Sequence, residues 1–254
     1  TAASLASRQK ARVALLDFDL QFGDCALLLD LAPRNNMGDA LRQAERIDGT
    51  LLKALMTEHS SGLHVLASPS SPAGSGSLSP QAVRAVIDAA SAAYDVVIVD
   101  LPRTVEPWTL EAIKAATTTF LVVQNNLATI RDARLLLDHL PRAGIDARRV
   151  ELVNNRAMAK VPSVSIEQLK ETLKHDKAHR VRNDYVNAVA AEDQGMPVSK
   201  VAPRCGLAKD IDALADYLWQ AHGHGQVKKE GLLDKLFHPK PAAGRKAAPA
   251  KSGK

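Results

Sequence analysis

The chain has 254 residues, of which 46% are hydrophobic and 24% are charged, the composition of a globular protein with one sizeable core. Its two cysteines lie outside any Cys-x-x-Cys motif, which excludes a disulfide scaffold and a multi-cysteine metal site and favours a reducing, cytoplasmic setting. The net charge is +5, but residues 223–254 carry +6 and residues 1–222 carry −1. Nucleic-acid binding by the body of the protein is therefore not indicated.

Alternating apolar and amphipathic segments predict an α/β protein. Five apolar runs lack the alternation of polar and apolar residues, which is typical of buried parallel strands. They lie at 12–17, 63–67, 95–100, 120–124 and 150–154. Helical patterns occupy 48–57, 79–93, 127–140, 166–175, 185–192 and 207–221. Ser79 and Pro80 are typical of a helix start. A doubly wound, mostly parallel sheet with helices on both faces is the expected architecture.

Two regions are expected along the chain. Residues 1–222 form the folded domain, whereas 223–254 are a basic tail whose Lys, Ala, Gly and Pro cannot bury a core and should be mostly disordered. Within the tail, 227–238 is amphipathic, with its apolar side chains on one helical face.

Acidic residues end two of the predicted strands. Asp17 ends the first run and Asp100 ends the third. Ligands of open α/β sheets bind at the carboxyl ends of strands, and Mg²⁺ is commonly held there by one or two carboxylates with phosphate oxygens and water. The alternative for Asp100 is a carboxylate that caps the following helix.

Three sequence motifs resemble one ATPase family. The sequence LDFDLQ at 16–21, followed by Gly23 and Asp24, resembles the switch region of the MinD/ParA deviant Walker A ATPases. The sequences DLPRT at 100–104, EPWTL at 106–110 and LATIRDAR at 127–134 resemble the CpaE/TadZ branch, whose members help to assemble Flp-type (Tad) pili. The similarity runs over about residues 1–218, and it implies a P-loop NTPase fold with ATP and Mg²⁺ as cofactors.

The resemblance also implies roles for the acidic residues. Asp17 would lie near Mg²⁺ and the attacking water, and Asp19 would belong to the same switch. Asp100 would be the Walker B aspartate that holds Mg²⁺ through water.

A polar sequence after the run at 150–154 is the expected adenine site. By resemblance Asn155 would face the base, with Asn154 as the one-residue alternative and Arg156 beside it. An Asn side chain offers both a donor and an acceptor, which suits the adenine edge. The alternative is a turn-forming Asn pair.

The family's phosphate loop, lysine-Gly-Gly-x-Gly followed by Ser or Thr, does not occur in the 254 residues. The sequence TAASLA at 1–6 resembles the helix that follows this loop. The chain is thus expected to lack the first strand and the loop, and to hydrolyse ATP weakly or not at all. The missing strand would lie near the centre of the sheet, so its absence should leave a groove or destabilise the body.

By resemblance, the protein would be a homodimer that assembles and places a Flp-type pilus with the pilus machinery proteins. It would be cytoplasmic, peripheral on the inner membrane or at a cell pole, with 227–238 on anionic lipid. One alternative is a non-hydrolysing scaffold on the same fold. Another is a ParA-like partition ATPase whose tail binds DNA, which the near-neutral body and the apolar face of the tail disfavour.

Overall fold

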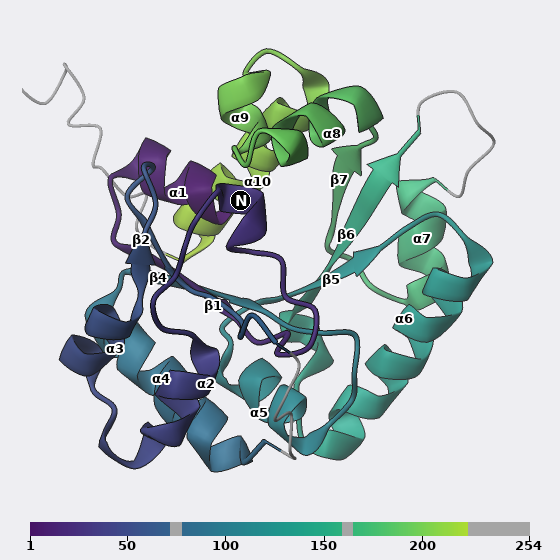
Figure 1. Cartoon of the computed structure of the whole chain (residues 1–254). Coiled ribbons are helices and arrows are strands. Elements are labelled where there is room, and N and C mark those ends of the chain that lie inside the picture. The colour runs from purple at the N-terminus through teal and green to yellow at the C-terminus, as the bar shows by residue number, and fades with distance from the viewer. Residues whose placement is uncertain (72–77, 159–164, 223–254) are drawn as a thin grey trace, which may run out of the picture.

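The computed structural model describes residues 1–71, 78–158 and 165–222, and the basic tail lies outside them. Figure 1 shows the elements in space. The first half of the chain forms α1 (Ala2–Gln9), β1 (Val13–Asp17), η1 (Leu27–Leu29), α2 (Met37–Arg42), η2 (Ala44–Arg46), α3 (Gly49–Leu55), β2 (Thr57–Glu58), β3 (Leu63–Leu66), α4 (Pro80–Ala93), β4 (Val96–Asp100) and α5 (Pro107–Ala115). The second half forms β5 (Thr119–Val123), α6 (Leu127–His139), η3 (Leu140–Ala143), η4 (Ala147–Arg149), β6 (Val150–Ala157), α7 (Ile166–Leu173), β7 (Ala178–Arg182), α8 (Tyr185–Asp193), α9 (Val198–Val201) and α10 (Gly206–Ala221).

The predicted α/β alternation is confirmed. All five apolar runs form strands, and the six predicted helices are present with ends that differ by at most two residues. The helix start is also as predicted, since the Ser79 hydroxyl accepts a hydrogen bond from the Ala82 N–H and Pro80 occupies the first turn of α4. The elements that were not predicted include strands β2 and β7 and helices α2, α5 and α9.

The strands form two sheets. The first has the order β2-β3-β1-β4, parallel except for β2, and the second has the order β5-β6-β7, wholly parallel. Helix α5 connects the last strand of the first sheet to the first strand of the second. The register sets Asp17 opposite Asp100 at the carboxyl ends of β1 and β4, and it sets Val123 opposite Asn154 in the second sheet.

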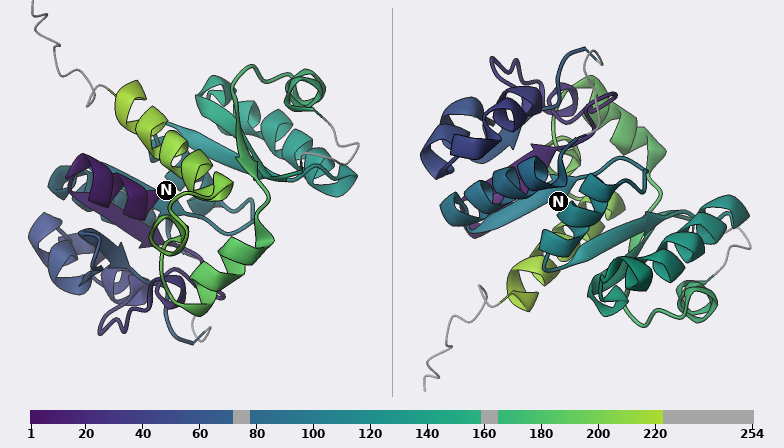
Figure 2. Two further views of the ribbon diagram at one scale, coloured as in Figure 1. Left: turned by 90° about the horizontal axis from the view of Figure 1, so that it is seen from above. Right: turned by 90° about the horizontal axis from the view of Figure 1, so that it is seen from below.

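Helices cover both faces of the sheets. Val13 and Leu15 of β1 pack on the side of α1 and α10, whereas Leu16 packs with α3, α4 and the start of α5. Helices α1 and α10 lie side by side over one face, as seen from above in Figure 2. Leu214 of α10 packs on the second sheet, so this helix joins the two sheets.

The facing edges of the two sheets are open. Among the described residues, β4 pairs only with β1 and β5 only with β6. The first five residues of β1 and of β6, which have a strand on each side, are all buried. Strands β4 and β5 are equally apolar, yet Val123 is their only buried residue. Because parallel strands normally pair on both edges, the exposure of β4 and β5 follows from edges that have no neighbouring strand among the described residues.

Candidate functional site

The two predicted metal ligands lie side by side. Strands β1 and β4 run parallel with Asp17 opposite Asp100, and the Phe18 N–H donates to the Asp100 carbonyl at 2.9 Å. Asp17 is fully buried, whereas Asp100 is exposed at the open edge of β4. The structure therefore brings these carboxylates together at the carboxyl ends of adjacent strands.

The loop after β1 folds back over Asp17. The N–H groups of Asp19 and Cys25 donate to the two Asp17 carboxylate oxygens at 3.1 and 3.3 Å. A Cβ atom at Gly23 would lie 2.5 Å from both oxygens, so only glycine fits there. The Ser68 hydroxyl holds the loop by donating to the Gly23 carbonyl at 2.8 Å. The carboxylate is thus fixed in position before any ligand arrives.

The same loop adds a residue that sequence reasoning missed. The Cys25 thiol donates to Oδ2 of Asp100 at 3.4 Å, and the ligating atoms of Asp17, Cys25 and Asp100 all lie within 4.8 Å of one another. Cys25 is half-buried beside the apolar residues that pack between β1, α1 and α10, and its sulfur also contacts a carboxylate. The available signal was its position eight residues after Asp17, in a loop that must stay close to the end of β1.

The site carries uncompensated negative charge. Burial raises the pKa of Asp17, and the neighbouring Asp100 adds to the effect. Burial likewise raises the pKa of Asp100. Within the described part of the chain, neither carboxylate has a Lys, Arg or His in ion-pair distance. By contrast, the carboxylate of Glu151, which is also buried, has partners: it lies 3.0 Å from the Lys177 Nζ and 2.7 Å from the His179 Nε2.

Asp19 lies beside this cluster and has a different environment. One of its carboxylate oxygens accepts the N–H groups of Gln21 and Phe22 at 3.2 and 3.0 Å, which closes a turn. This side chain shapes the loop and is not among the three ligating groups.

The candidate adenine residues lie at the end of β6. Asn154 is buried, and its Oδ1 has no hydrogen-bond partner among the residues that the structure describes. Asn155 is half-buried, and its Oδ1 accepts the N–H of Arg156 at 2.9 Å. Arg156 is exposed and has a left-handed φ of 54°. The free acceptor is thus on Asn154, whereas the Asn155 oxygen is engaged in a local turn.

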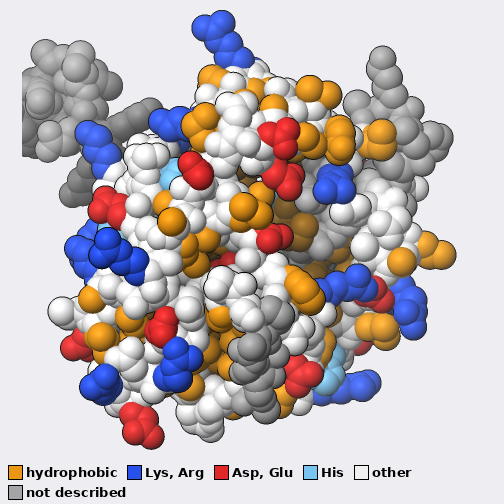
Figure 3. All heavy atoms as spheres, viewed as in Figure 1, with side chains coloured by type: hydrophobic (Ala, Val, Ile, Leu, Met, Phe, Trp, Pro, Cys, Tyr) orange, Lys and Arg blue, Asp and Glu red, His pale blue; other side chains and the backbone are white. Residues whose placement is uncertain are grey.

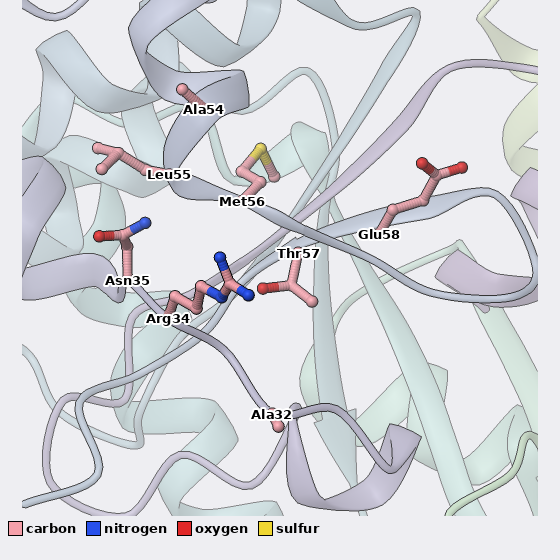
Figure 4. Close-up of a pocket in the computed structure, with 8 residues that line it drawn as sticks. All are labelled: Ala32, Arg34, Asn35, Ala54, Leu55, Met56, Thr57 and Glu58. Carbon is pink, nitrogen blue, oxygen red and sulfur yellow. The ribbon is translucent and has the colours of Figure 1, made fainter.

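A pocket of about 300 Å³ lies away from these residues, between the loop after η1 and the end of α3 (Figure 4). It is lined by Ala32, Arg34, Asn35, Ala54, Leu55, Met56, Thr57 and Glu58. None of the predicted site residues lines it. In Figure 3, acidic and hydrophobic side chains gather instead around a hollow in the middle of the face seen in Figure 1.

Comparison with known proteins shows the fold. No family model matches the chain, and no curated protein matches it. A ParA family ATPase from Chlorobium tepidum TLS superposes with a TM-score of 0.77 at 22% identity, over 85% of this chain and 90% of that one. MinD from Pyrococcus horikoshii OT3, complexed with Mg-ADP, gives 0.71 at 17% identity over 87% and 89%. A putative plasmid partition protein from Borrelia burgdorferi B31, bound to AMPPNP, gives 0.66 at 12% identity over 86% and 92%.

The chain therefore has the fold of the MinD and ParA ATPases, as the sequence predicted. The similarities are below 25% identity and concern the fold. No helix in the described ranges is long and apolar enough to cross a membrane.

Proposed function

We propose that this protein binds ATP and Mg²⁺ as a MinD/ParA-like protein does. The observation that carries the proposal is the pair Asp17 and Asp100, which lie at the carboxyl ends of adjacent parallel strands. Neither carboxylate has a cationic partner in the part of the chain that the structure describes. This is the position where open α/β folds bind nucleotides, and a Mg²⁺–phosphate complex would supply the missing positive charge.

Each predicted residue has a part in this proposal. Asp100, exposed at the strand end, would hold Mg²⁺ through water, and Asp17 would orient the water that attacks the terminal phosphate. Asp19 would keep the switch loop in shape through its turn. Asn154 or Asn155 would face the adenine, with Arg156 beside it, and the free Oδ1 of Asn154 supports Asn154 as the acceptor for the exocyclic amino group. The bound metal would neutralise charge on the phosphates.

The unpaired edges of β4 and β5 indicate where a phosphate-binding segment could be added. We propose that an extended segment from outside the described residues pairs with both β4 and β5 and merges the two sheets. A loop that follows such a strand would reach the carboxyl edge beside Asp100, where its N–H groups could bind phosphates. The half-exposed apolar residues of β4 and β5 support this arrangement.

Exposed apolar residues next to the site support a homodimer. Phe22, on the loop that carries Cys25, is 76% exposed, and Leu27, at the start of η1, is 73% exposed. Side chains of this size contribute strongly to association when buried. Phe22→Ser should therefore weaken nucleotide-dependent dimerisation in analytical ultracentrifugation, and an unchanged dimer would argue against this face.

The sequence resemblance supports a cellular role in assembling and placing a Flp-type pilus, with the pilus machinery as partners. The second candidate, from the same resemblance, is a scaffold on the same fold that does not hydrolyse ATP. The ParA-like partition role stays the third candidate.

Nucleotide binding can be tested directly. Binding of a fluorescent ATP analogue with Mg²⁺ should be lost in Asp17→Ala and Asp100→Asn and retained in Asp88→Asn, an exposed site on α4. The same assay on a longer chain with the preceding coding sequence should give tighter binding if a strand fills the gap. Equal binding by Asp100→Asn and wild type would overturn the site assignment.

Cellular assays separate the two main candidates. Deleting the gene in the source organism should abolish Flp-type pili, and expressing the Asp88→Asn variant in the deletion strain should restore them. If Asp100→Asn also restores them, the scaffold candidate is favoured over the ATPase.

The proposed membrane contact through 227–238 has its own test. Deleting residues 226–254 should abolish sedimentation with anionic vesicles, and unaffected sedimentation would remove the proposed contact. Salt-sensitive DNA binding that disappears with the tail would favour the partition role.

A further inference from the structure

A serine that follows the neighbouring strand holds the loop that covers Asp17. Strand β3 pairs with β1 on the side away from β4, and Ser68 lies two residues beyond the end of β3. The Ser68 hydroxyl donates to the carbonyl of Gly23 at 2.8 Å, across 45 positions of sequence. Asp17 thus ends a central strand, with Asp100 beyond one neighbouring strand and Ser68 beyond the other.

Gly23 is the point where the loop meets both groups. A Cβ atom at this position would lie 2.5 Å from each carboxylate oxygen of Asp17 and 2.5 Å from Oγ of Ser68. The N–H groups of Asp19 and Cys25, which donate to Asp17, belong to the same loop. A loop displaced from Ser68 would therefore also move its glycine and its N–H donors away from the Asp17 carboxylate.

The backbone on both sides of Ser68 is fixed. Ala67, the residue before it, is buried, and its carbonyl accepts the Met37 N–H at 2.7 Å. Pro69 follows, and its ring restricts the backbone of both residues. By contrast, Phe22 of the loop is 76% exposed, so little apolar packing holds the loop there. The serine hydroxyl is therefore a rigid anchor for a weakly packed segment.

We propose that Ser68 is a positioning residue of the candidate site, whose hydroxyl fixes the loop and through it the Asp17 carboxylate. The proposal rests on the proposed function in taking Asp17 and Asp100 as the carboxylates of a Mg²⁺–nucleotide site. Because Ser68 acts through the loop on Asp17, its loss should weaken the part of nucleotide binding that depends on Mg²⁺. Loss of one neutral hydrogen bond corresponds to about a fivefold change in an equilibrium constant.

The test compares the binding of a fluorescent ATP analogue to the full-length chain in Mg²⁺ and in EDTA. Ser68→Ala should reduce the gain in affinity from Mg²⁺ about fivefold and leave the affinity in EDTA unchanged. Ser68→Thr keeps a hydroxyl and should retain the wild-type gain. Ser91→Ala is the matched control, because the Ser91 hydroxyl also donates to a carbonyl at 2.8 Å, that of Ile87 within α4. This control should bind as wild type does.

Hydrogen exchange of the nucleotide-free chain tests the loop contact itself. The amides of Asp19 and Cys25 donate to Asp17, and they should exchange about fivefold faster in Ser68→Ala than in wild type. Ser91→Ala should leave both rates unchanged. Circular dichroism of each variant checks that the fold is intact.

Three outcomes would overturn the proposal. They are unchanged exchange at both amides in Ser68→Ala, an unchanged gain from Mg²⁺ despite faster exchange, and equal losses in Ser68→Ala and Ser68→Thr. The proposed function fails separately, if the wild-type chain binds no nucleotide in Mg²⁺. In that case the role of Ser68 toward the metal fails with it, and the exchange rates still show whether Ser68 holds the loop.

Discussion

Asp100→Asn should stabilise the metal-free protein while it removes metal binding. Burial and the neighbouring Asp19 raise the pKa of Asp100, which means that its ionised form is disfavoured in the fold. The side chain accepts only the weak thiol donor of Cys25, so an amide at this position loses little hydrogen bonding. The substitution also removes a negative charge beside the buried carboxylate of Asp17.

The expected gain is modest because Asp100 is exposed, so that solvent screens its charge. Active-site substitutions that relieve such conflicts add about 0.5–2 kcal/mol, and solvent screening favours the lower half of that range. For a chain of this size, about 0.5–1 kcal/mol corresponds to a rise of about 1–4 °C in Tm. Urea denaturation should show a higher midpoint with an unchanged slope. All samples need a metal chelator, since a bound cation would reverse the sign.

The matched control is Asp95→Asn, just before the other end of the same strand. The Asp95 carboxylate accepts the Arg12 N–H at 2.9 Å and pairs with its guanidinium at 2.6 Å, so this variant should be less stable than wild type. The advantage of Asp100→Asn should be complete at pH 7 and should vanish as the pH falls to the ordinary carboxyl value of 3.8. A less stable Asp100→Asn variant, or an advantage that grows in acid, would refute the electrostatic argument.

Two further variants test the packing. Tyr217→Phe removes a 2.9 Å hydrogen bond to buried Glu151 and should lower the free energy of unfolding by about 1.5 kcal/mol in urea, whereas Tyr185→Phe, at an exposed ring, should change it by less than about 0.5 kcal/mol. Burial opposes the ionisation of Glu151, but its hydrogen bonds prevail and lower its pKa, so its stabilising effect should be present above pH 4.5 and lost below it in acid titrations. Gly23→Ala forces a Cβ against Asp17 and should lower the free energy of unfolding by about 1–3 kcal/mol; an unchanged urea midpoint would contradict the close contact.

The strands and helices that carry strong apolar patterns could be predicted from the sequence. Strand β7 could not, because Ala-His-Arg-Val-Arg is mostly polar and only Val181 is buried. It is a strand because it pairs with β6 and because Val181 packs on Leu214 of α10, both of which are contacts between distant segments. Helix α5 was missed because its nine residues are short for a periodicity signal, although Glu106 and Thr109 form a capping box at its start.

The carboxylate pair of the candidate site could be predicted, because a strand-terminal acid is visible in the sequence and parallel strands end at a common edge. The thiol of Cys25 could not, since its contact with Asp100 depends on how the loop folds over Asp17. The same holds for the bonds from His179 and Tyr217 to Glu151, which join residues that are far apart in the chain. Local pattern therefore identified the groups at strand ends and missed the groups that loops and distant helices bring to them.

The edges of β4 and β5 show that an apolar sequence pattern does not by itself determine whether a strand is buried. Val-Val-Ile-Val-Asp of β4 is at least as apolar as Val-Ala-Leu-Leu-Asp of β1, and both patterns predict a buried strand. Only β1 is buried, because burial of a parallel strand depends on a second strand at its side as well as on the helices above and below it. The composition of β4 and β5 is therefore suited to an environment that the described residues supply only in part. A strand between them would bury both, and its carboxyl end would lie beside Asp100.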